Sequence, residues 1–481
     1  MSENFGVPRM GWHTKDIASP VAARYENGMR TLALLALLFG TRPATAAGPT
    51  FAIKYERTVL PNGLVVIYHE DHSLPQVVVN LWYHVGSKDE RAGRTGFAHL
   101  FEHLMFMGSK NVPYDLEKGA GLFDLIMEAQ GGANNASTSN DRTNYFEEGP
   151  PRLLETFLWL EADRIATLSQ TIDQEKVDRQ RRIVQNERRQ SYENRPYGTA
   201  RLAIEEEMFP DGHPYHHPVI GSHEDLVRAT ADDVRQFFDT WYVPANASLV
   251  IAGDFDTSAA KPLIEKYFGW IQRPAPPPPP KAEPVHLAAP KERTLTDHVR
   301  LPRDYIVYHA PADFADGSAE CDVIAAVLGG AKSSRLSRAL LLDRQLVQDV
   351  SAYCETRQLA GIISIVATAK PGQRLGDIEK IIDAEVARLR SEPPTPAEVE
   401  RAVAGIEMET AQALESARAR ADRLNAYELA FHDPGRLGWD MARYRAVTPE
   451  SVHTWAERLL DPKDRLVLHV VPDDVQKKVS K

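Results

Sequence analysis

A run of prolines near the middle of the chain limits what this sequence can fold into. Six of the seven residues from Pro274 to Pro280 are proline. Proline has no backbone N–H and fixes φ, so the run can neither continue a helix nor enter the centre of a sheet. We therefore predict a stiff, extended linker at 273–284. It divides the chain into an N-terminal domain, 48–272, and a C-terminal domain, 285–481.

Both predicted domains mix strands with helices. The first begins with a hairpin around Asn62-Gly63 and an apolar strand at 76–85. Its helices are predicted at 96–107, 120–130, 151–168, 173–191, 230–242 and 258–268, and the second domain repeats this order loosely, with helices at 317–328, 333–343 and between 375 and 460. The acidic run Glu205–Glu207 is expected to lie on a solvated helix face. The pattern predicts the α+β class, with an internal duplication and an antiparallel sheet covered by helices in each copy.

The N-terminus has the layout of an export signal. Within 29–47, a short positive start at Met29-Arg30 is followed by an apolar run from Leu32 to Phe39 and then by small residues. The run is too short to span a bilayer, so no stable membrane anchor is expected. Residues 1–28 form a polar extension, which leaves Met1 and Met29 as alternative starts of translation. We expect the mature protein to be periplasmic.

Composition bears on partners and on redox state. The formal net charge is -11 and the sequence contains no basic stripe and no Lys/Arg run interleaved with aromatic residues, which argues against nucleic acid as the main partner. The two cysteines are Cys321 and Cys354. An oxidising compartment permits a disulfide between them, but two buried free thiols are equally compatible with the sequence.

One short segment carries residues suited to metal chemistry. His99, Glu102 and His103 lie within five residues of a predicted helix. Residues four apart project from the same helix face, so the two imidazoles can bind one zinc ion. Glu102 flanks that face and can take a proton from an attacking water without being a ligand. The order is the inverse of the His-Glu-x-x-His motif. An ordinary amphipathic helix is the alternative, because apolar residues surround the three polar ones.

A zinc site of this kind needs a third protein ligand. Glu187 lies in a later predicted helix, and a shell of two histidines and one glutamate leaves a fourth position open for water. By composition alone, Glu175, Asp178 and Glu193 are equally suitable carboxylates.

Several motifs in a fixed order resemble the pitrilysin or insulinase-type zinc metallopeptidases, in the branch of the mitochondrial processing peptidase. They are GFAHLFEHLMFMGS, EAQGGANNASTSNDRTNYF, IVQNERR, HPYHHPVIGSHEDL, WYVPANASLVIAGDF and VLGGAKSSRLSRALL. The resemblance covers Glu56 to Asp474. It implies two αβ domains that face each other like a clamshell, and one zinc ion per chain. It selects His99, His103 and Glu187 as ligands and Glu102 as general base.

The resemblance also implies where a substrate would bind. Ala133–Phe146 would be an edge strand, and an extended peptide can add to such an edge through backbone hydrogen bonds. The residues expected nearest the scissile bond are Asn135, Ala136, Ser137 and Thr138. A structural strand entered through a Gly/Asn-rich turn is the alternative.

The C-terminal domain departs from the family pattern. Active members usually carry an arginine and a tyrosine after the Ser-Arg-Leu segment, and Leu341 and Gln348 stand at these places. Tyr353 is near but out of register. The departure predicts a heterodimer in which a homologous partner subunit supplies the Arg–Tyr pair, with a self-sufficient homodimer as the alternative.

The sequence thus predicts a zinc-dependent endopeptidase that acts on peptides or unfolded segments. A catalytically silent structural or processing subunit is the alternative. A zinc-storage protein would need neither Glu102 nor an open ligand position.

Overall fold

The computed structural model describes residues 51–473. The predicted extension at 1–28 and the signal peptide at 29–47 lie outside the described residues. Among the residues that are described, no helix combines the length and the apolar character needed to cross a membrane.

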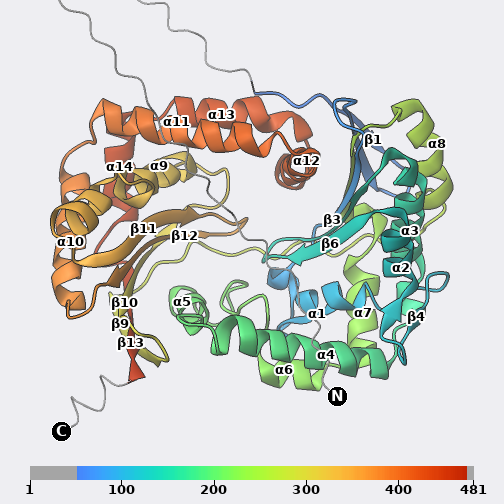
Figure 1. Cartoon of the computed structure of the whole chain (residues 1–481), viewed down its shortest axis with the longest axis horizontal. Coiled ribbons are helices and arrows are strands. Elements are labelled where there is room, and N and C mark those ends of the chain that lie inside the picture. The colour runs from blue at the N-terminus through green and yellow to red at the C-terminus, as the bar shows by residue number, and fades with distance from the viewer. Residues whose placement is uncertain (1–50, 474–481) are drawn as a thin grey trace, which may run out of the picture. The chain divides into compact units, whose positions relative to one another are not determined.

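The first half of the chain builds a six-stranded sheet in the order β1-β2-β8-β3-β7-β6 (Figure 1). The strands are β1 (Glu56–Val59), β2 (Val65–Glu70), β3 (Val77–Tyr83), β6 (Ala133–Thr138), β7 (Thr143–Gly149) and β8 (Ala247–Gly253). Every residue of β3 and β8 is buried, as expected for central strands with a predominantly apolar sequence. Strand β6 pairs only with β7 and therefore leaves a free edge.

The second half builds a five-stranded sheet in the order β11-β12-β10-β13-β9. Its strands are β9 (Lys291–Asp297), β10 (Arg303–Ala310), β11 (Val347–Glu355), β12 (Gly361–Ala369) and β13 (Arg465–Pro472). Read from β9, this order matches β2-β8-β3-β7-β6, with β1 as an extra strand. The proline-rich residues 271–290 between the two sheets contain neither helix nor strand. The predicted fold class and internal duplication are confirmed.

Each sheet also contains one parallel pair, which the expectation of purely antiparallel sheets did not include. Strand β2 runs parallel to β8, and β13 runs parallel to β9. In both halves these two strands stand at the beginning and the end of the duplicated unit. The long helical connection between them allows the last strand to return in the direction of the first.

Helices cover the sheets. Those of the first half are α1 (Phe97–Leu104), α2 (Leu122–Gln130), α3 (Leu154–Thr167), α4 (Gln174–Arg188), α5 (Thr199–Met208), α6 (His223–Arg228), α7 (Ala231–Trp241) and α8 (Thr257–Phe268). Those of the second half are α9 (Ser318–Gly329), α10 (Leu375–Ser391), α11 (Pro396–Ala413), α12 (Ala417–Phe431), α13 (Leu437–Arg445) and α14 (Pro449–Leu459). The predicted α-helix at 333–343 is instead π-helical from Ser337 to Asp343. Residues Tyr114–Asp115 and Ala120–Gly121 form the small strands β4 and β5.

Each half of the chain contributes one helix to the sheet of the other half. Helix α12 packs Ala421 and Leu424 against Val78 and Val250 of the first sheet. Helix α5 packs against the second sheet in a cluster that contains Ala200, Ala203, Ile204, Met208, Val307, Ile362, Leu466 and Leu468. The two halves therefore share their cores.

The two cysteines form a disulfide, which settles the alternative left open by the sequence. Cys321 lies in α9 and Cys354 in β11, with their Cα atoms 5.9 Å apart. The bond ties a buried helix to the edge strand of the second sheet.

Candidate metal centre

Helix α1 carries the two histidines and is fixed at its N-terminus by a buried carboxylate. Glu90 accepts hydrogen bonds from the backbone N–H of Gly96 (2.8 Å) and of Ala98 (2.7 Å). An anion at this end of a helix satisfies free N–H groups and complements the helix dipole. The face opposite the histidines is buried, which fixes the rotation of the helix; its apolar residues are Phe97, Leu100, Phe101 and Leu104.

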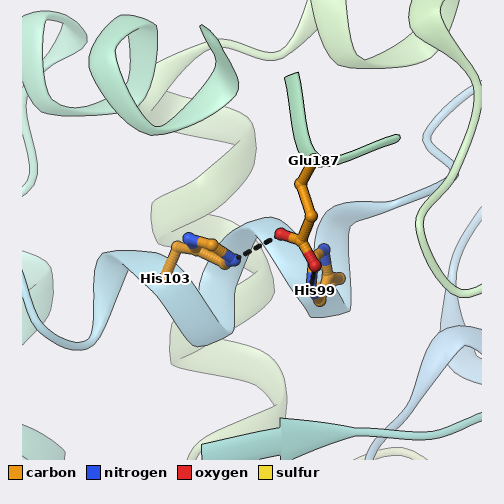
Figure 2. Close-up of side chains that lie close together, drawn as sticks. All are labelled: His99, His103 and Glu187. Carbon is orange, nitrogen blue, oxygen red and sulfur yellow. Dashed lines mark ion pairs between the residues drawn. The ribbon is translucent and has the colours of Figure 1, made fainter. Parts of the chain in front are cut away.

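His99 and His103 project toward α4, where Glu187 lies between them (Figure 2). The two imidazole rings are 4.9 Å apart between centroids. The carboxylate oxygens of Glu187 lie 3.7 Å from Nε2 of His99 and 3.3 Å from Nε2 of His103. Three potential ligand atoms, one from each residue, thus converge from two helices within 4.8 Å of one another.

These separations fit the ligand shell of a zinc ion. Ligands about 2.0–2.1 Å from a tetrahedral zinc ion lie roughly 3.3 Å from one another. The nitrogen–oxygen distances to Glu187 are close to that value and longer than a good hydrogen bond. Burial, followed by the neighbouring His103, lowers the pKa of His99 to about 4, which favours the neutral imidazole that a metal requires.

Two further groups of histidine and carboxylate residues have a different geometry. In the second sheet, Nδ1 of His469 lies 2.7 Å from Oδ1 of Asp304. Nearby, Asp464 lies 2.9 Å from Nδ1 of His309 and 2.7 Å from Nδ1 of His286. These are hydrogen-bond distances that leave no room for an ion between donor and acceptor. Within residues 51–473, only the trio on α1 and α4 combines convergence with the spacing of a metal shell.

The other carboxylates considered for the third ligand point elsewhere. Glu175 is exposed. Asp178 pairs with Arg181, while Glu193 accepts hydrogen bonds from Arg188 and His223. The structure therefore places Glu187, and none of these three, beside the histidines.

Glu102 lies next to the trio but outside it. Its Oε2 accepts a hydrogen bond from the hydroxyl of Thr138, at 2.5 Å. Burial is the main cause of the raised pKa of Glu102. Thr138 is the last residue of β6, so this hydrogen bond joins the free sheet edge to the helix that carries the histidines.

The prediction that Ala133–Phe146 forms one edge strand is wrong. Only β6 lies at the edge, and β7 lies inside the sheet. The hydroxyl of Ser139 accepts hydrogen bonds from the backbone N–H of Asp141 and Arg142, which folds the chain into a tight turn between the strands. The backbone N–H of Ala136 donates to the side-chain oxygen of Asn135, and so β6 keeps an N–H group that β7 does not use.

A cavity of about 340 Å³ opens beside the trio and is lined by both halves of the chain. The first half contributes His99, Glu187 and Thr138, and the second contributes residues 355–357. Among the four predicted substrate-binding residues, only Thr138 lines this cavity. Asn135, Ala136 and Ser137 lie along the same edge strand.

Sequence reasoning missed several residues of the cavity, namely Tyr192, Arg201, Glu205, Glu355 and Arg357. The expectation that Glu205 lies on a solvated helix face is wrong, because its exposed fraction is 1%. Helix α5 turns this residue toward the second half of the chain. No local sequence signal indicates that contact.

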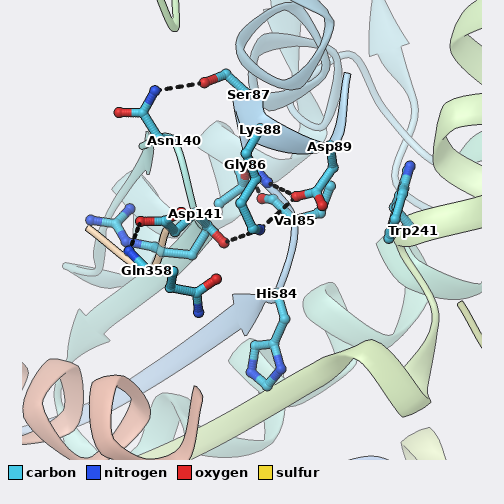
Figure 3. Close-up of polar contacts among 12 residues, drawn as sticks. His84, Val85, Gly86, Ser87, Lys88, Asp89, Asn140, Asp141, Trp241 and Gln358 are labelled. Atoms are coloured by element: carbon cyan, nitrogen blue, oxygen red, sulfur yellow. Dashed lines mark hydrogen bonds and ion pairs between the residues drawn. The ribbon is translucent and has the colours of Figure 1, made fainter. Parts of the chain in front are cut away.

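The cavity wall from the second half is held in place by Asp141, in the turn after β6 (Figure 3). The carboxylate of Asp141 accepts hydrogen bonds from the backbone N–H of Gln358 (3.1 Å) and from the hydroxyl of Tyr215 (2.6 Å). The same hydroxyl accepts the N–H of Leu359 (3.0 Å). Lys88, a buried cation, donates to the backbone carbonyl of Asp141 (3.2 Å). The loop that carries Arg357 is thus fixed relative to the metal centre.

The chain is similar to known zinc proteases and peptidases. Residues 65–214 match the family profile described as insulinase (peptidase family M16), and residues 228–406 match the profile of the peptidase M16 inactive domain. The chain is 30% identical to zinc protease PqqE of Helicobacter pylori over 376 residues, which is 77% of this chain and 83% of that protein. It is 26% identical over 407 residues to a probable mitochondrial-processing peptidase subunit beta of Schizosaccharomyces pombe, covering 79% and 82%.

A solved structure shows the same fold. The crystal structure of a protease from Helicobacter pylori superposes with a TM-score of 0.81 at 26% identity, over 88% of this chain and 100% of that one. The profile of the first half spans both the histidine helix and Glu187, whereas the second half has no such helix.

Proposed function

Because the chain belongs to the insulinase (M16) peptidase family, we propose that it is a zinc-dependent endopeptidase that hydrolyses peptides or unfolded segments. The observation that carries this proposal is the contact between Glu102 and Thr138. It puts a carboxylate that is not part of the ligand trio between the trio and a free sheet edge. A storage site for zinc has no use for that arrangement.

The chemistry follows from the residues of the site. His99, His103 and Glu187 would hold the zinc ion, which when bound supplies a Lewis acid that polarises the scissile carbonyl and makes water more acidic. Glu102 then takes a proton from the attacking water and delivers it to the leaving amine. Thr138 holds the Glu102 carboxylate in one orientation through its hydroxyl.

Substrate would bind to the edge of β6 as an added strand, along Asn135, Ala136, Ser137 and Thr138. The outward N–H of Ala136 is the first available donor, and a peptide carbonyl would replace the side-chain oxygen of Asn135 that accepts from it now. Since backbone groups make these contacts, the edge itself accepts many side chains. Preference among peptides must come from the cavities beside it.

Two properties of the chain support export to the periplasm. The segment 29–47 has the composition of a cleavable signal. The disulfide between Cys321 and Cys354 is of a kind that persists in oxidising compartments.

We also propose that a homologous partner subunit supplies the Arg–Tyr pair. Leu341, at the place of the arginine, packs against the core of the second half, and Gln348, at the place of the tyrosine, is exposed. Neither side chain lines the cavity at the metal centre. A homodimer remains the alternative assembly.

Peptide cleavage by the purified chain tests the proposal, alone and with a co-expressed homologue that carries the Arg–Tyr pair. The Glu102→Gln variant should lose about 10²–10⁴-fold in kcat while its zinc content stays the same. Cleavage only with the homologue supports the heterodimer, and strong cleavage by the chain alone contradicts it. If zinc is bound but no combination cleaves, the chain is a structural subunit instead.

A further inference from the structure

A second cavity continues from the one at the metal centre. It has a volume of about 400 Å³ and shares five lining residues with the first cavity, namely Tyr192, Arg201, Glu205, Glu355 and Arg357. Its walls come from the segment around α5 in the first half and from the second sheet, where β10, β12 and the free edge strand β11 all contribute. A peptide bound at the metal centre could therefore reach this second cavity, here called the arginine cavity.

The arginine cavity is lined by more cations than anions. Its charged residues are Arg195, Arg201, Arg303 and Arg357 against Glu205 and Glu355. This is an excess of two positive charges, in a chain whose formal net charge is -11. The local charge is thus opposite to that of the molecule.

The two glutamates are already engaged by two of the arginines. Glu355 accepts a hydrogen bond from Nε of Arg357 at 3.2 Å, and one of its oxygens lies 3.6 Å from Arg201. Glu205 lies 3.8 Å from Arg357 and 3.7 Å from Arg201. Burial raises the pKa of Glu205 to about 7, so its negative charge is incomplete near neutral pH. Arg357 is buried, whereas the side chain of Arg201 is 58% exposed.

The other two arginines have no carboxylate partner among the described residues. The exposed side chain of Arg195 makes neither a hydrogen bond nor an ion pair there. Arg303 donates to the hydroxyl of Thr368 (2.8 Å) and lies over the ring of Tyr197. Asp349 accepts from the same Thr368 hydroxyl (3.0 Å) but does not line the cavity. Guanidinium N–H groups therefore remain available to a ligand.

Tyrosines complete the wall. Tyr353 projects from β11 with 44% of its surface exposed, and Tyr192, Tyr197 and Tyr305 also line the cavity. Phenol hydroxyls donate hydrogen bonds to carboxylates, and planar guanidinium groups bind them in pairs of parallel hydrogen bonds. Both residue types in this cavity suit the same ligand chemistry.

We propose that the arginine cavity is a substrate subsite for the carboxylate groups of an acidic peptide segment. Arg195 and Arg201 make the principal contacts, because they are the two exposed arginines of the cavity and Arg201 lies beyond hydrogen-bond distance from both glutamates. The segment lies several residues from the bond at the candidate metal centre. The inference rests on the proposed peptidase function, for which it names the substrate class.

The test measures peptide binding by fluorescence anisotropy in the Glu102→Gln chain, where substrate is not consumed. One labelled peptide carries three glutamates beside a neutral central sequence. The matched control peptide carries three glutamines in their place. The acidic peptide should bind about 5–20-fold more tightly at roughly 50 mM ionic strength, and this ratio should shrink at about 300 mM. Each peptide is also made with a C-terminal amide, which separates side-chain carboxylates from the terminal one.

Matched variants locate the effect. In the same background, Arg195→Gln combined with Arg201→Gln should reduce the ratio to below about two-fold. The control combines Arg182→Gln on α4 with Arg338→Gln, two exposed arginines outside the cavity, and removes the same net charge. This control variant should bind the acidic peptide with the same preference over the glutamine peptide as the chain with its arginines intact.

Equal affinities for the two peptides in the chain with its arginines intact would overturn the subsite, as would equal losses in both double variants. A preference that depends only on the terminal carboxylate would support the cavity but assign it to chain ends. Failure of the peptidase proposal is seen separately, as absence of cleavage by the chain with Glu102 in place.

Discussion

At the scale of single residues, a hydrogen bond from Thr138 joins the sheet edge to Glu102, the proposed general base. Replacing it with valine removes the hydroxyl that donates to Glu102 and keeps the shape of the side chain. We expect kcat to fall roughly ten-fold, because the carboxylate loses its fixed orientation, while zinc content stays unchanged. Steady-state kinetics with metal analysis checks this.

Thr138→Ser is the matched control, since it keeps the donor. Its kcat should stay within about two-fold of the parent. If the serine and valine variants lower kcat equally, Thr138 acts through the shape of its side chain and not through a hydrogen bond.

Because Glu205 is buried, the stability of the folded chain should depend on pH. Its pKa rises from 4.5 to about 7, chiefly through burial, so the folded chain holds this proton more tightly than the unfolded chain. The free energy of unfolding therefore decreases as pH rises from about 4.5 to 7. The charged groups that act on the pKa of Glu205 are Arg357, Arg201 and Glu355.

Glu205→Gln removes the buried charge. We expect its free energy of unfolding to exceed that of the parent by roughly 1–3 kcal/mol at pH 8, with a smaller difference at pH 5. Denaturant unfolding at both pH values measures this. A variant that is less stable than the parent at pH 8 would show that the ion pairs to Arg201 and Arg357 outweigh desolvation.

Site residues that lie close together in the sequence could be predicted from it. His99, Glu102 and His103 follow from one helix turn, because spacing alone puts them on a common face. Glu187 required the resemblance of its surrounding motif, since several nearby carboxylates have the same chemistry. Glu205 and Arg357 could not be found at all, because contacts between the two halves of the chain bring them to the site.

At the scale of elements, the free edge of β6 allows a test that leaves the sheet intact. The N–H of Ala136 points away from β7, so Ala136→Pro removes no hydrogen bond between the strands of the sheet. We expect the free energy of unfolding to change by less than about 1 kcal/mol and kcat/KM to fall at least ten-fold. Thermal unfolding and peptide cleavage provide the two measurements.

Asn135→Pro is the control that should destabilise the sheet, unlike Ala136→Pro. Asn135 is the preceding residue of the same strand, and its N–H faces the opposite direction, toward β7. Loss of that ladder bond should destabilise the sheet. If Ala136→Pro keeps full activity, substrate does not add to this edge.

Elements were predicted well where the apolar pattern was regular. Strand β3 is apolar except at Asn80, and α1 and α8 each bury an apolar face. Strand β9 was missed because Lys291–Asp297 is charged and half exposed, and only its pairing with β13 makes it a strand. The hairpin of β6 and β7 was read as one strand because a turn formed by Ser139 interrupts an otherwise extended sequence.

At the scale of the whole molecule, each half of the chain depends for its stability on a helix from the other half, α5 or α12. Without α12, the first sheet would expose Ile67, Val78, Val250 and Ala252, which are fully buried in the intact chain. Arg57 would also lose its two hydrogen bonds to Glu428, each 2.8 Å long. An exposed apolar sheet face of this kind favours aggregation.

We therefore expect the fragments 48–272 and 285–481 to be poorly soluble when each is produced alone, and to form a soluble zinc-binding complex when produced together. Size-exclusion chromatography with metal analysis tests this. The intact chain is the control. A first fragment that unfolds cooperatively by itself would contradict the dependence.

The exchange of α12 also has a consequence for how the protein is made. The first sheet is complete in sequence at Gly253, but the helix that covers it ends at Phe431. At about 5–20 residues per second, a ribosome needs roughly ten to thirty-five seconds to extend the chain between these points. During that interval the first half cannot bury the sheet face that α12 covers. The nascent chain should therefore remain open to chaperones and translocation machinery until most of it has been synthesised.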